Sequence, residues 1–263
     1  MGTLSNENEE LVAIAWAPSG TRLALSWWHS GVSIWTADEA SGGKVTHTDF
    51  ENEVAWMSWS PCGTKLALAC NASSTLRIHE VSKDGEHRLL HSLPHHSPPV
   101  RVAWNPRGGL LATGDKSGAV WIWNEQGEDL VESPQERLQE IRHLVWSPEG
   151  TNLLSVAADG RALIWGRTRK GWGIGSVLQE GNFPVRWAAF SQNEQWVGLM
   201  GDARVKGRLR LFPVDLDTLV RCVQRLSWRN TLTQDESNKY LKVGAQPGKP
   251  RQATFKGEPP FAH

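Results

Sequence analysis

The sequence has no apolar run long enough to cross a bilayer, because about 18 uncharged apolar residues are needed and no stretch approaches that length. Its first ten residues contain three glutamates and lack the basic and apolar regions of a secretory leader. Cysteine occurs only three times, as Cys62, Cys70 and Cys222, and forms no CxxC pair. An odd number of cysteines fits reduced thiols better than a disulfide framework. We therefore expect a cytoplasmic protein with no membrane partner.

Net charge is also missing, because 28 Lys and Arg balance 28 Asp and Glu. The balance is uneven along the chain: residues 1–160 carry 11 basic and 20 acidic residues, a net charge of −9, whereas residues 161–263 carry 17 and 8, a net charge of +9. Overall neutrality argues against nucleic acid as a partner. The two halves either balance each other within the molecule or present a basic face to an acidic partner.

Motifs for catalysis or for a cofactor are absent. The sequence contains no G-x-S-x-G, no H-E-x-x-H and no EF-hand loop. The glycine-rich stretch 166–175 lacks the Gly-Lys-Ser/Thr ending of a phosphate loop, so we expect a basic loop between strands. His95 and His96 have no visible third ligand, and a hydrogen-bonded structural histidine is the better interpretation. We expect no catalytic residue, no metal and no cofactor.

What the chain does have is an internal repeat of about 44 residues. An aromatic residue followed by a turn recurs at spacings of 43, 45, 42 and 44 residues. An alternating apolar run ends 19 to 22 residues after each aromatic residue. The five turns are Trp16-Ala-Pro-Ser-Gly20, Trp59-Ser-Pro-Cys-Gly63, Trp104-Asn-Pro-Arg-Gly108, Trp146-Ser-Pro-Glu-Gly150 and the degenerate Phe190-Ser-Gln-Asn-Glu194. The five runs are Val32-Ser-Ile-Trp35, Leu76-Arg-Ile-His79, Val120-Trp-Ile-Trp123, Ala162-Leu-Ile-Trp165 and Leu209-Arg-Leu-Phe212.

Each unit has the pattern of consecutive antiparallel strands. In the third unit, proline and glycine at 105–108 form a tight turn between two short apolar segments. A second turn follows, and the next segment alternates with period two. The predicted strands are 100–104, 110–113 and 119–123, with an outer, solvated strand and a loop in 129–140. Four short strands repeated every 43 residues or so are typical of propeller blades.

These turns and terminal strands resemble the WD-repeat (WD40) family across about residues 11–212. The chain departs from that family because the dipeptide Trp-Asp never occurs and the Gly-His opening is missing. His96 is the best placed candidate for the family's blade histidine, and Asp159-Gly160 is the clearest of its turn aspartates. The resemblance therefore implies an all-β propeller with an incomplete internal hydrogen-bond network.

Five blades are fewer than the seven that WD-repeat propellers most often have, so the ring has five blades or is open. We expect a flexible segment at 1–10, blades at about 11–50, 51–97, 98–138, 139–181 and 182–212, a helical segment at 213–241 and a flexible tail at 242–263. Apolar residues at helical spacing between Leu216 and Leu226 predict the helix. The segment 213–241 also resembles the C-terminal end of prokaryotic NACHT or NB-ARC signalling ATPases that carry WD repeats.

Tryptophans at repeat positions, including Trp16, Trp59, Trp104 and Trp146, are expected in the core. Trp28 falls outside the repeat and Trp172 lies in the basic loop, so each is either an exposed anchor or packs on a neighbouring loop. If propeller geometry applies, the turns between the second and third strands gather on one face. The residues expected there for binding a partner are Trp28, His29, Asn71, Lys116, Asp159 and Arg204.

The sequence thus predicts a non-catalytic interaction module that binds a protein or peptide through this loop face. The tail resemblance implies that such a module is the sensing end of a prokaryotic signalling or defence ATPase assembly. One alternative is a structural subunit whose open propeller is completed in trans, or by self-association through an open blade edge. A propeller hydrolase is the least favoured alternative, because no recurrent set of inward acids or histidines is visible.

Overall fold

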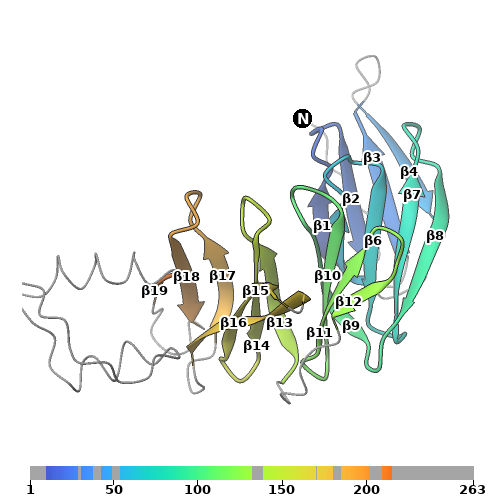
Figure 1. Ribbon diagram of the computed structural model, residues 1–263. Helices are drawn as coiled ribbons and strands as arrows, with labels where there is room; N and C mark the ends of the chain where they lie inside the picture. The colour runs from blue at the N-terminus through green and yellow to red at the C-terminus, as the bar shows by residue number, and fades with distance from the viewer. Residues whose placement is uncertain are drawn as a thin grey trace, which may run out of the picture. The chain divides into compact units, whose positions relative to one another are not determined.

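A computed structural model describes residues 10–28, 31–37, 43–48, 54–131, 139–169, 171–179, 185–201 and 209–214. Every regular element within these residues is a β-strand (Figure 1). No helix in the described part of the chain is long and apolar enough to cross a bilayer. The chain divides into two compact units after Phe212, and the sheets belong to the first. The predicted helix beyond Pro213 lies outside the described residues.

The strands form five antiparallel sheets in chain order, which we call blades one to five. Blade one contains β1 (Leu11–Trp16), β2 (Arg22–Trp27), β3 (Gly31–Thr36) and β4 (Lys44–Thr48). Blade two contains β5 (Val54–Trp59), β6 (Lys65–Cys70), β7 (Thr75–Val81) and β8 (His87–Pro94). Blade three contains β9 (Pro99–Trp104), β10 (Leu110–Asp115), β11 (Val120–Asn124) and β12 (Asp129–Val131). Blade four contains β13 (Ile141–Trp146), β14 (Asn152–Ala157), β15 (Ala162–Thr168) and β16 (Gly171–Gln179). Blade five contains β17 (Val185–Phe190), β18 (Trp196–Gly201) and β19 (Leu209–Pro213).

The Pro-Gly turns close the first hairpin of each blade, as the repeat predicted. In blade three the Gly108 amide donates to the Asn105 carbonyl over 2.9 Å, and the glycine has a φ of +79°. Glycine fits because a side chain at positive φ is strained. Blade five uses Glu194 at the matching position, with a φ of 55°. The degenerate fifth repeat therefore keeps the turn although it has lost the glycine.

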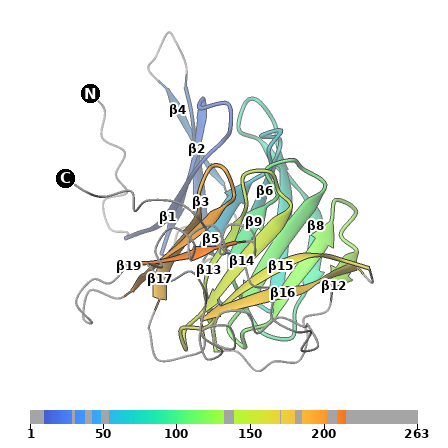
Figure 2. The ribbon, with the colours of Figure 1, turned by 60° about the vertical axis from the view of Figure 1, so that its left-hand side comes forward.

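Neighbouring blades pack through one recurring contact. In blades one to three, the third strand supplies apolar side chains to a cluster that also contains the first strand of the next blade. Ile34 of β3 shares such a cluster with Met57 and Trp59 of β5. The same pairing joins β7 to β9 and β11 to β13. The sheets therefore lie side by side in chain order (Figures 1 and 2). The hydrophobic core is distributed between blades and is not a single central cluster.

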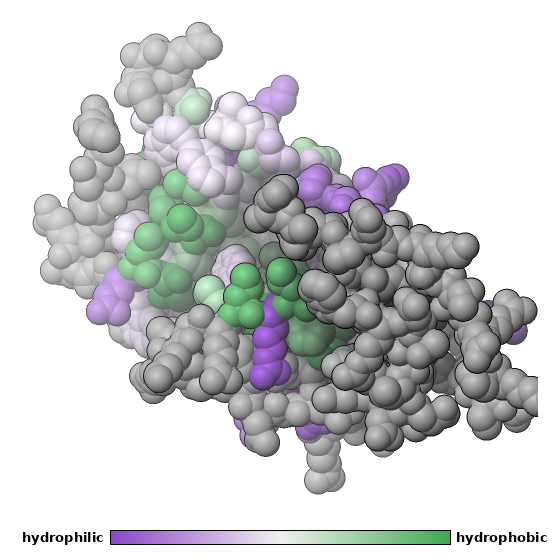
Figure 3. Space-filling view, turned by 90° about the vertical axis from the view of Figure 1, so that its left-hand side faces the viewer, coloured by the Kyte–Doolittle hydropathy of each residue, from purple (hydrophilic) through white to green (hydrophobic). Residues whose placement is uncertain are grey.

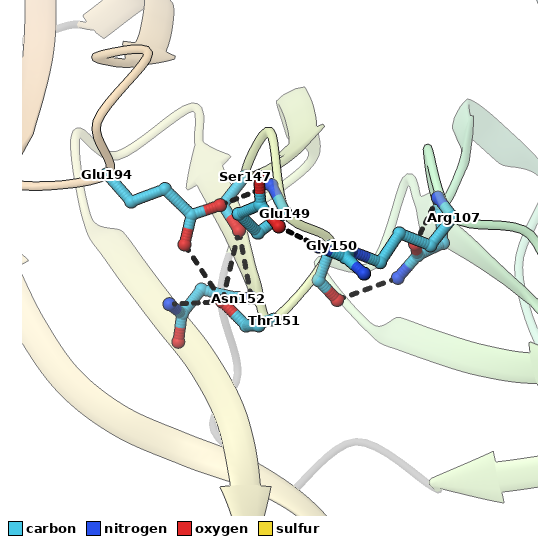
Figure 4. A network of polar contacts seen from close by, with 8 residues as sticks. Arg107, Ser147, Glu149, Gly150, Thr151, Asn152 and Glu194 are labelled. Carbon is cyan, nitrogen blue, oxygen red and sulfur yellow. Dashed lines mark hydrogen bonds and ion pairs between the residues drawn. The ribbon is translucent and has the colours of Figure 1, made fainter.

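The first-hairpin turns of adjacent blades are also tied together by polar contacts (Figure 4). The Asn105 amide nitrogen donates to the Gly150 carbonyl over 2.8 Å, which joins blades three and four. The Glu194 carboxylate accepts from the Glu149 amide and, over 2.9 Å, from the Thr151 hydroxyl, which joins blades four and five. These bonds hold the turn of Glu194 in its left-handed conformation.

The ring is not closed by the described strands. Packing between first strands runs from β1 to β5, β9, β13 and β17. Among the described strands, no comparable packing joins β17 to β1. Trp16, which we expected in the core, is accordingly 55% exposed. That prediction was wrong because an inter-blade core position is buried only when a preceding blade covers it.

The prediction of a basic loop for the glycine-rich stretch 166–175 was also wrong. The stretch forms the hairpin between β15 and β16 and is not a free basic loop. Trp172 is buried and packs edge-on against Trp146, with ring centroids 5.3 Å apart. The Arg167 guanidinium lies over the Trp172 ring at 5.5 Å. The glycines allow an extended strand here, and Trp172 is a core residue. The all-β propeller class with an open ring is confirmed.

Candidate functional site

The turns between the second and third strands lie at one end of their sheets, because each blade is antiparallel in chain order. Four of the six predicted binding residues lie in these turns within the described chain. They are Trp28 in blade one, Asn71 in blade two, Lys116 in blade three and Asp159 in blade four. His29 and Arg204 lie outside the described residues. We refer to the four described turns as the loop face.

Two of these turns contact each other directly. The Lys116 ammonium donates to the Asn71 carbonyl over 3.3 Å, which links blade three to blade two. Lys116 is exposed and Asn71 is half-buried. The Lys116 backbone amide donates to the Pro98 carbonyl over 3.1 Å, so the turn that carries the lysine is fixed. The structure thus brings Asn71 and Lys116 together.

Trp28 and Trp27 are adjacent in sequence but have opposite environments. Trp27 is buried, and its indole N–H donates to the Ser33 hydroxyl over 2.9 Å. Trp28 is 47% exposed, and its backbone amide donates to the Glu10 carbonyl over 3.0 Å. The backbone of Trp28 is therefore held while much of its ring faces solvent. An exposed tryptophan whose backbone is held in this way has the form of an interface anchor.

The Asp159 carboxylate makes its hydrogen bonds within its own turn. It accepts from the Arg161 backbone amide over 3.0 Å and from the Arg161 guanidinium over 2.9 Å. The pair is partly buried. Asp159 therefore stabilises its own turn, and it places the Arg161 guanidinium beside it. Arg161 was not among the predicted binding residues, although its position two residues after a turn aspartate was visible in the sequence.

A buried polar network lies beneath the loop face in blade three. The His95 ring contacts the Thr113 hydroxyl through Nε2 over 2.7 Å and the Leu93 carbonyl through Nδ1 over 3.0 Å. The Trp123 indole N–H donates to the same Thr113 hydroxyl over 3.1 Å. The blade histidine is therefore His95, and the prediction of His96 was wrong because His96 is exposed. Blade three therefore keeps the His95–Thr113–Trp123 part of the network, while the Oδ2 atom of Asp115 has no hydrogen-bond partner, so the network is incomplete here, as expected.

Asp115 is the turn aspartate that the sequence analysis overlooked. Its side chain is fully buried, and its Oδ1 atom accepts from the amides of Ser117 and Ala119 and from the Ser117 hydroxyl. These bonds, 2.6–2.9 Å long, fix the turn that presents Lys116. Blade four keeps a shorter form of the network, in which the Trp165 indole N–H donates to the Ser155 hydroxyl over 2.8 Å.

Buried histidines in this protein are kept neutral. Burial and, to a smaller extent, the positive charge of Arg101 together lower the pKa of His143 from its usual 6.5 to about 4. Burial, with His87 and Arg77, lowers the pKa of His79 to about 4 as well. No group of three or more His, Cys, Asp or Glu side chains within the described residues has the arrangement of a metal site.

These two histidines predict a loss of stability in mild acid. An unfolded histidine takes up a proton below about pH 6.5, whereas the folded groups resist protonation until about pH 4. Stability should therefore be complete above pH 7 and fall as the pH drops from 6.5 towards 4, by about 1 kcal/mol per histidine at pH 5.5. Urea unfolding at pH 7.5, 6.5 and 5.5 measures this. The variant His143→Phe should lose less stability over the same range, and an unchanged slope would contradict the assignment.

Known proteins resemble this chain in its repeats. The sequence profile of the first β-propeller of IFT140 matches residues 68–186. The mouse F-box-like/WD repeat-containing protein TBL1X is 30% identical over 162 residues, which cover 62% of this chain and 24% of the mouse protein. The WD repeat-containing protein srw1 of Schizosaccharomyces pombe is 22% identical over 166 residues, 61% of this chain and 29% of srw1. The chain thus spans about a quarter of the length of these relatives.

Among solved structures, hydrazine synthase of Kuenenia stuttgartiensis superposes with a TM-score of 0.61 at 13% identity. The superposition covers 81% of this chain and 69% of that one, and at this identity it shows a shared fold alone. Sheets of four antiparallel strands that pack in chain order define a repeat protein of the β-propeller class. In its repeat motifs and its relatives, the chain is similar to WD40-repeat β-propeller proteins.

Proposed function

We propose that this chain is a non-catalytic interaction module that binds a protein or peptide through the loop face. The observation that carries the proposal is Trp28, a large aromatic side chain that is 47% exposed on a turn whose backbone is held. Tryptophan is enriched among the residues that dominate binding energy at protein interfaces. The relatives are named for their WD repeats, which supports a binding role for this chain.

The other loop-face residues determine the kind of partner that fits. Lys116 is exposed, and the guanidinium of Arg161 lies on the neighbouring turn of blade four. An aromatic anchor with nearby cations suits a peptide that contains an acidic residue next to an apolar one. His29 and Arg204, which lie outside the described residues, stay predictions for the same surface. A cytoplasmic setting accords with the free, exposed thiol of Cys62.

A role as the sensing end of a larger prokaryotic signalling or defence assembly stays a prediction from the tail resemblance. It concerns segment 213–241, nearly all of which lies outside the described residues. The loop face could serve such an assembly by recognising its trigger. The binding proposal for the loop face holds with or without that assembly.

The double variant Trp28→Ala, Lys116→Glu tests the loop face. Peptides are first selected from a displayed random library on the immobilised wild-type chain, and their affinities are measured by fluorescence anisotropy. We expect the double variant to bind them at least tenfold more weakly, because an anchor and a charge are lost. Its melting temperature should change by no more than about 2 °C, since both side chains are exposed.

The matched control is Lys83→Glu. Lys83 is exposed in the turn between β7 and β8, which lies at the opposite end of the sheet from the loop face. It undergoes the same charge change as Lys116, so peptide binding should stay at the wild-type level. The proposal fails if the control and the double variant lose binding equally, or if the double variant binds as well as the wild type.

A further inference from the structure

The two end blades expose the two halves of the contact that joins all the other blades. On the first-strand side, Trp59, Trp104 and Trp146 are each no more than 7% exposed, because each packs on the blade before it. The matching Trp16 of blade one is 55% exposed, and Ile14, two residues earlier on the same strand, is 58% exposed. The positions that match Ile14 are buried: Met57, Val102 and Leu144.

Blade five shows the complementary half on its third strand. Leu209 and Leu211 of β19 are 66% and 62% exposed. Their counterparts in the other blades are no more than 4% exposed, because the next blade covers them: Val32 and Ile34, Leu76 and Ile78, Val120 and Ile122, and Ala162 and Ile164. Trp187 and Met200 add to the exposed apolar surface of blade five. Figure 3 looks from the side on which blade five lies and shows apolar side chains gathered there.

A directional hydrogen bond accompanies this packing for Trp59 and Trp146, though not for Trp104, whose indole N–H has no hydrogen-bond partner. The Trp59 indole N–H donates to the Ala15 carbonyl, and the Trp146 indole N–H donates to the Ala103 carbonyl, both over 2.9 Å. In each case the acceptor immediately precedes the repeat aromatic residue of the previous blade. By the same register, Trp16 would donate to the Ala189 carbonyl, which immediately precedes Phe190 in blade five.

We propose that two copies of this chain associate head to tail, with Ile14 and Trp16 of blade one packed on Leu209 and Leu211 of blade five of the other copy. Such a contact continues the packing that already joins consecutive blades, so it uses a geometry that the chain forms repeatedly. A second copy is the occupant because one chain carries both complementary faces, and its own β1 and β17 do not pack together in the described structure.

Charge complementarity favours the same orientation. Residues 1–160, which include blade one, carry a net charge of −9, and residues 161–263, which include blade five, carry +9. Head-to-tail contact brings the acidic part of one copy to the basic part of the next, whereas contact between two identical ends brings like charges together. The interface is separate from the loop face, so this inference does not depend on the proposed peptide binding.

Two variants that each lose one half of the contact provide the test. Trp16→Lys removes the blade-one half, and Leu211→Lys removes the blade-five half. Sedimentation velocity over a concentration series should show association of the wild type, and a monomer of 29.2 kDa for each variant alone. An equimolar mixture should recover a dimer, because the intact blade-five face of one variant meets the intact blade-one face of the other.

Controls make each outcome decisive. Leu89→Lys places the same charge on another exposed apolar side chain, in the outer strand of blade two, and should associate as the wild type does. If circular dichroism shows that either main variant is unfolded, Ile14→Lys and Leu209→Lys replace the pair. A wild type that stays monomeric at every concentration overturns the proposal. So does a mixture that fails to dimerise, or association that only the blade-one variant abolishes.

Discussion

Replacing Gly150 by alanine is expected to destabilise the protein by about 3 kcal/mol, which corresponds to a fall of roughly 6–12 °C in melting temperature for a domain of this size. Gly150 has a φ of +69°, a conformation that L side chains rarely adopt. An added Cβ would lie 2.2 Å from the Asn105 Oδ1 atom, so Asn105 would have to move. Asn105 is buried and forms the hydrogen bond that joins the turns of blades three and four.

Gly20→Ala is the matched control for this effect. Gly20 occupies the same turn position in blade one with a φ of +71°, but no atom lies within 4 Å of the point that an added Cβ would occupy. Only the backbone strain is then added, and the expected cost is about 1 kcal/mol. Thermal unfolding followed by circular dichroism measures both variants. Equal losses would show that the contact of Asn105 with Gly150 contributes little to joining these blades.

Replacing Thr113 by valine is expected to cost about 3 kcal/mol through the polar network of blade three. The substitution keeps the shape of the side chain and removes the hydroxyl that contacts His95 and Trp123. Both partners are buried, so a ring nitrogen of His95 and the indole N–H of Trp123 would be left unsatisfied. Each unsatisfied buried group costs about 1–3 kcal/mol.

The variant Ser155→Ala in blade four is the control, because its loss of stability measures one hydrogen bond of this kind without a buried histidine. Ser155 accepts from the Trp165 indole N–H over 2.8 Å in the shorter form of the same arrangement. Its loss should therefore cost about half as much as the loss of the Thr113 hydroxyl, roughly 1–2 kcal/mol. Urea unfolding of both variants gives the comparison. A larger effect of Ser155→Ala would contradict the importance that we assign to His95.

The repeat made the fold predictable from the sequence. Proline and glycine in the turns and the alternating third strands have local physical causes, so the first three strands of each blade could be anticipated. The outer strands were less predictable, because they bury one face at most and carry little periodicity, and the outer strand of blade three could be placed only within the broad range 129–140. β12 spans only Asp129–Val131, and β16 forms from a glycine-rich stretch that had the composition of a loop.

The errors concerned residues whose environment depends on another blade. Trp16 has the same local sequence pattern as Trp59, and only the presence of a preceding blade decides which of the two is buried. The choice between His95 and His96 depended on which ring reaches Thr113, 18 residues beyond His95 in sequence, and composition carries no information about that. The sequence correctly indicated which turns lie between the second and third strands. The ion pair between Asp159 and Arg161 was visible only in the structure.

The fold is stabilised by the packing of each blade on the next, and the outer faces of blades one and five have no neighbouring blade in the described structure. The solution mass of the wild-type chain, measured by light scattering over a concentration series, tests this claim most directly. We predict a mass that rises above 29.2 kDa as the concentration increases, because the exposed ends associate. The contrary result has two parts. The mass stays at 29.2 kDa at every concentration, and the variant Trp16→Phe shows no fall in acrylamide-quenchable fluorescence, which means that Trp16 is not exposed. Together they would show that the two ends cover each other within one molecule, and they would contradict the claim.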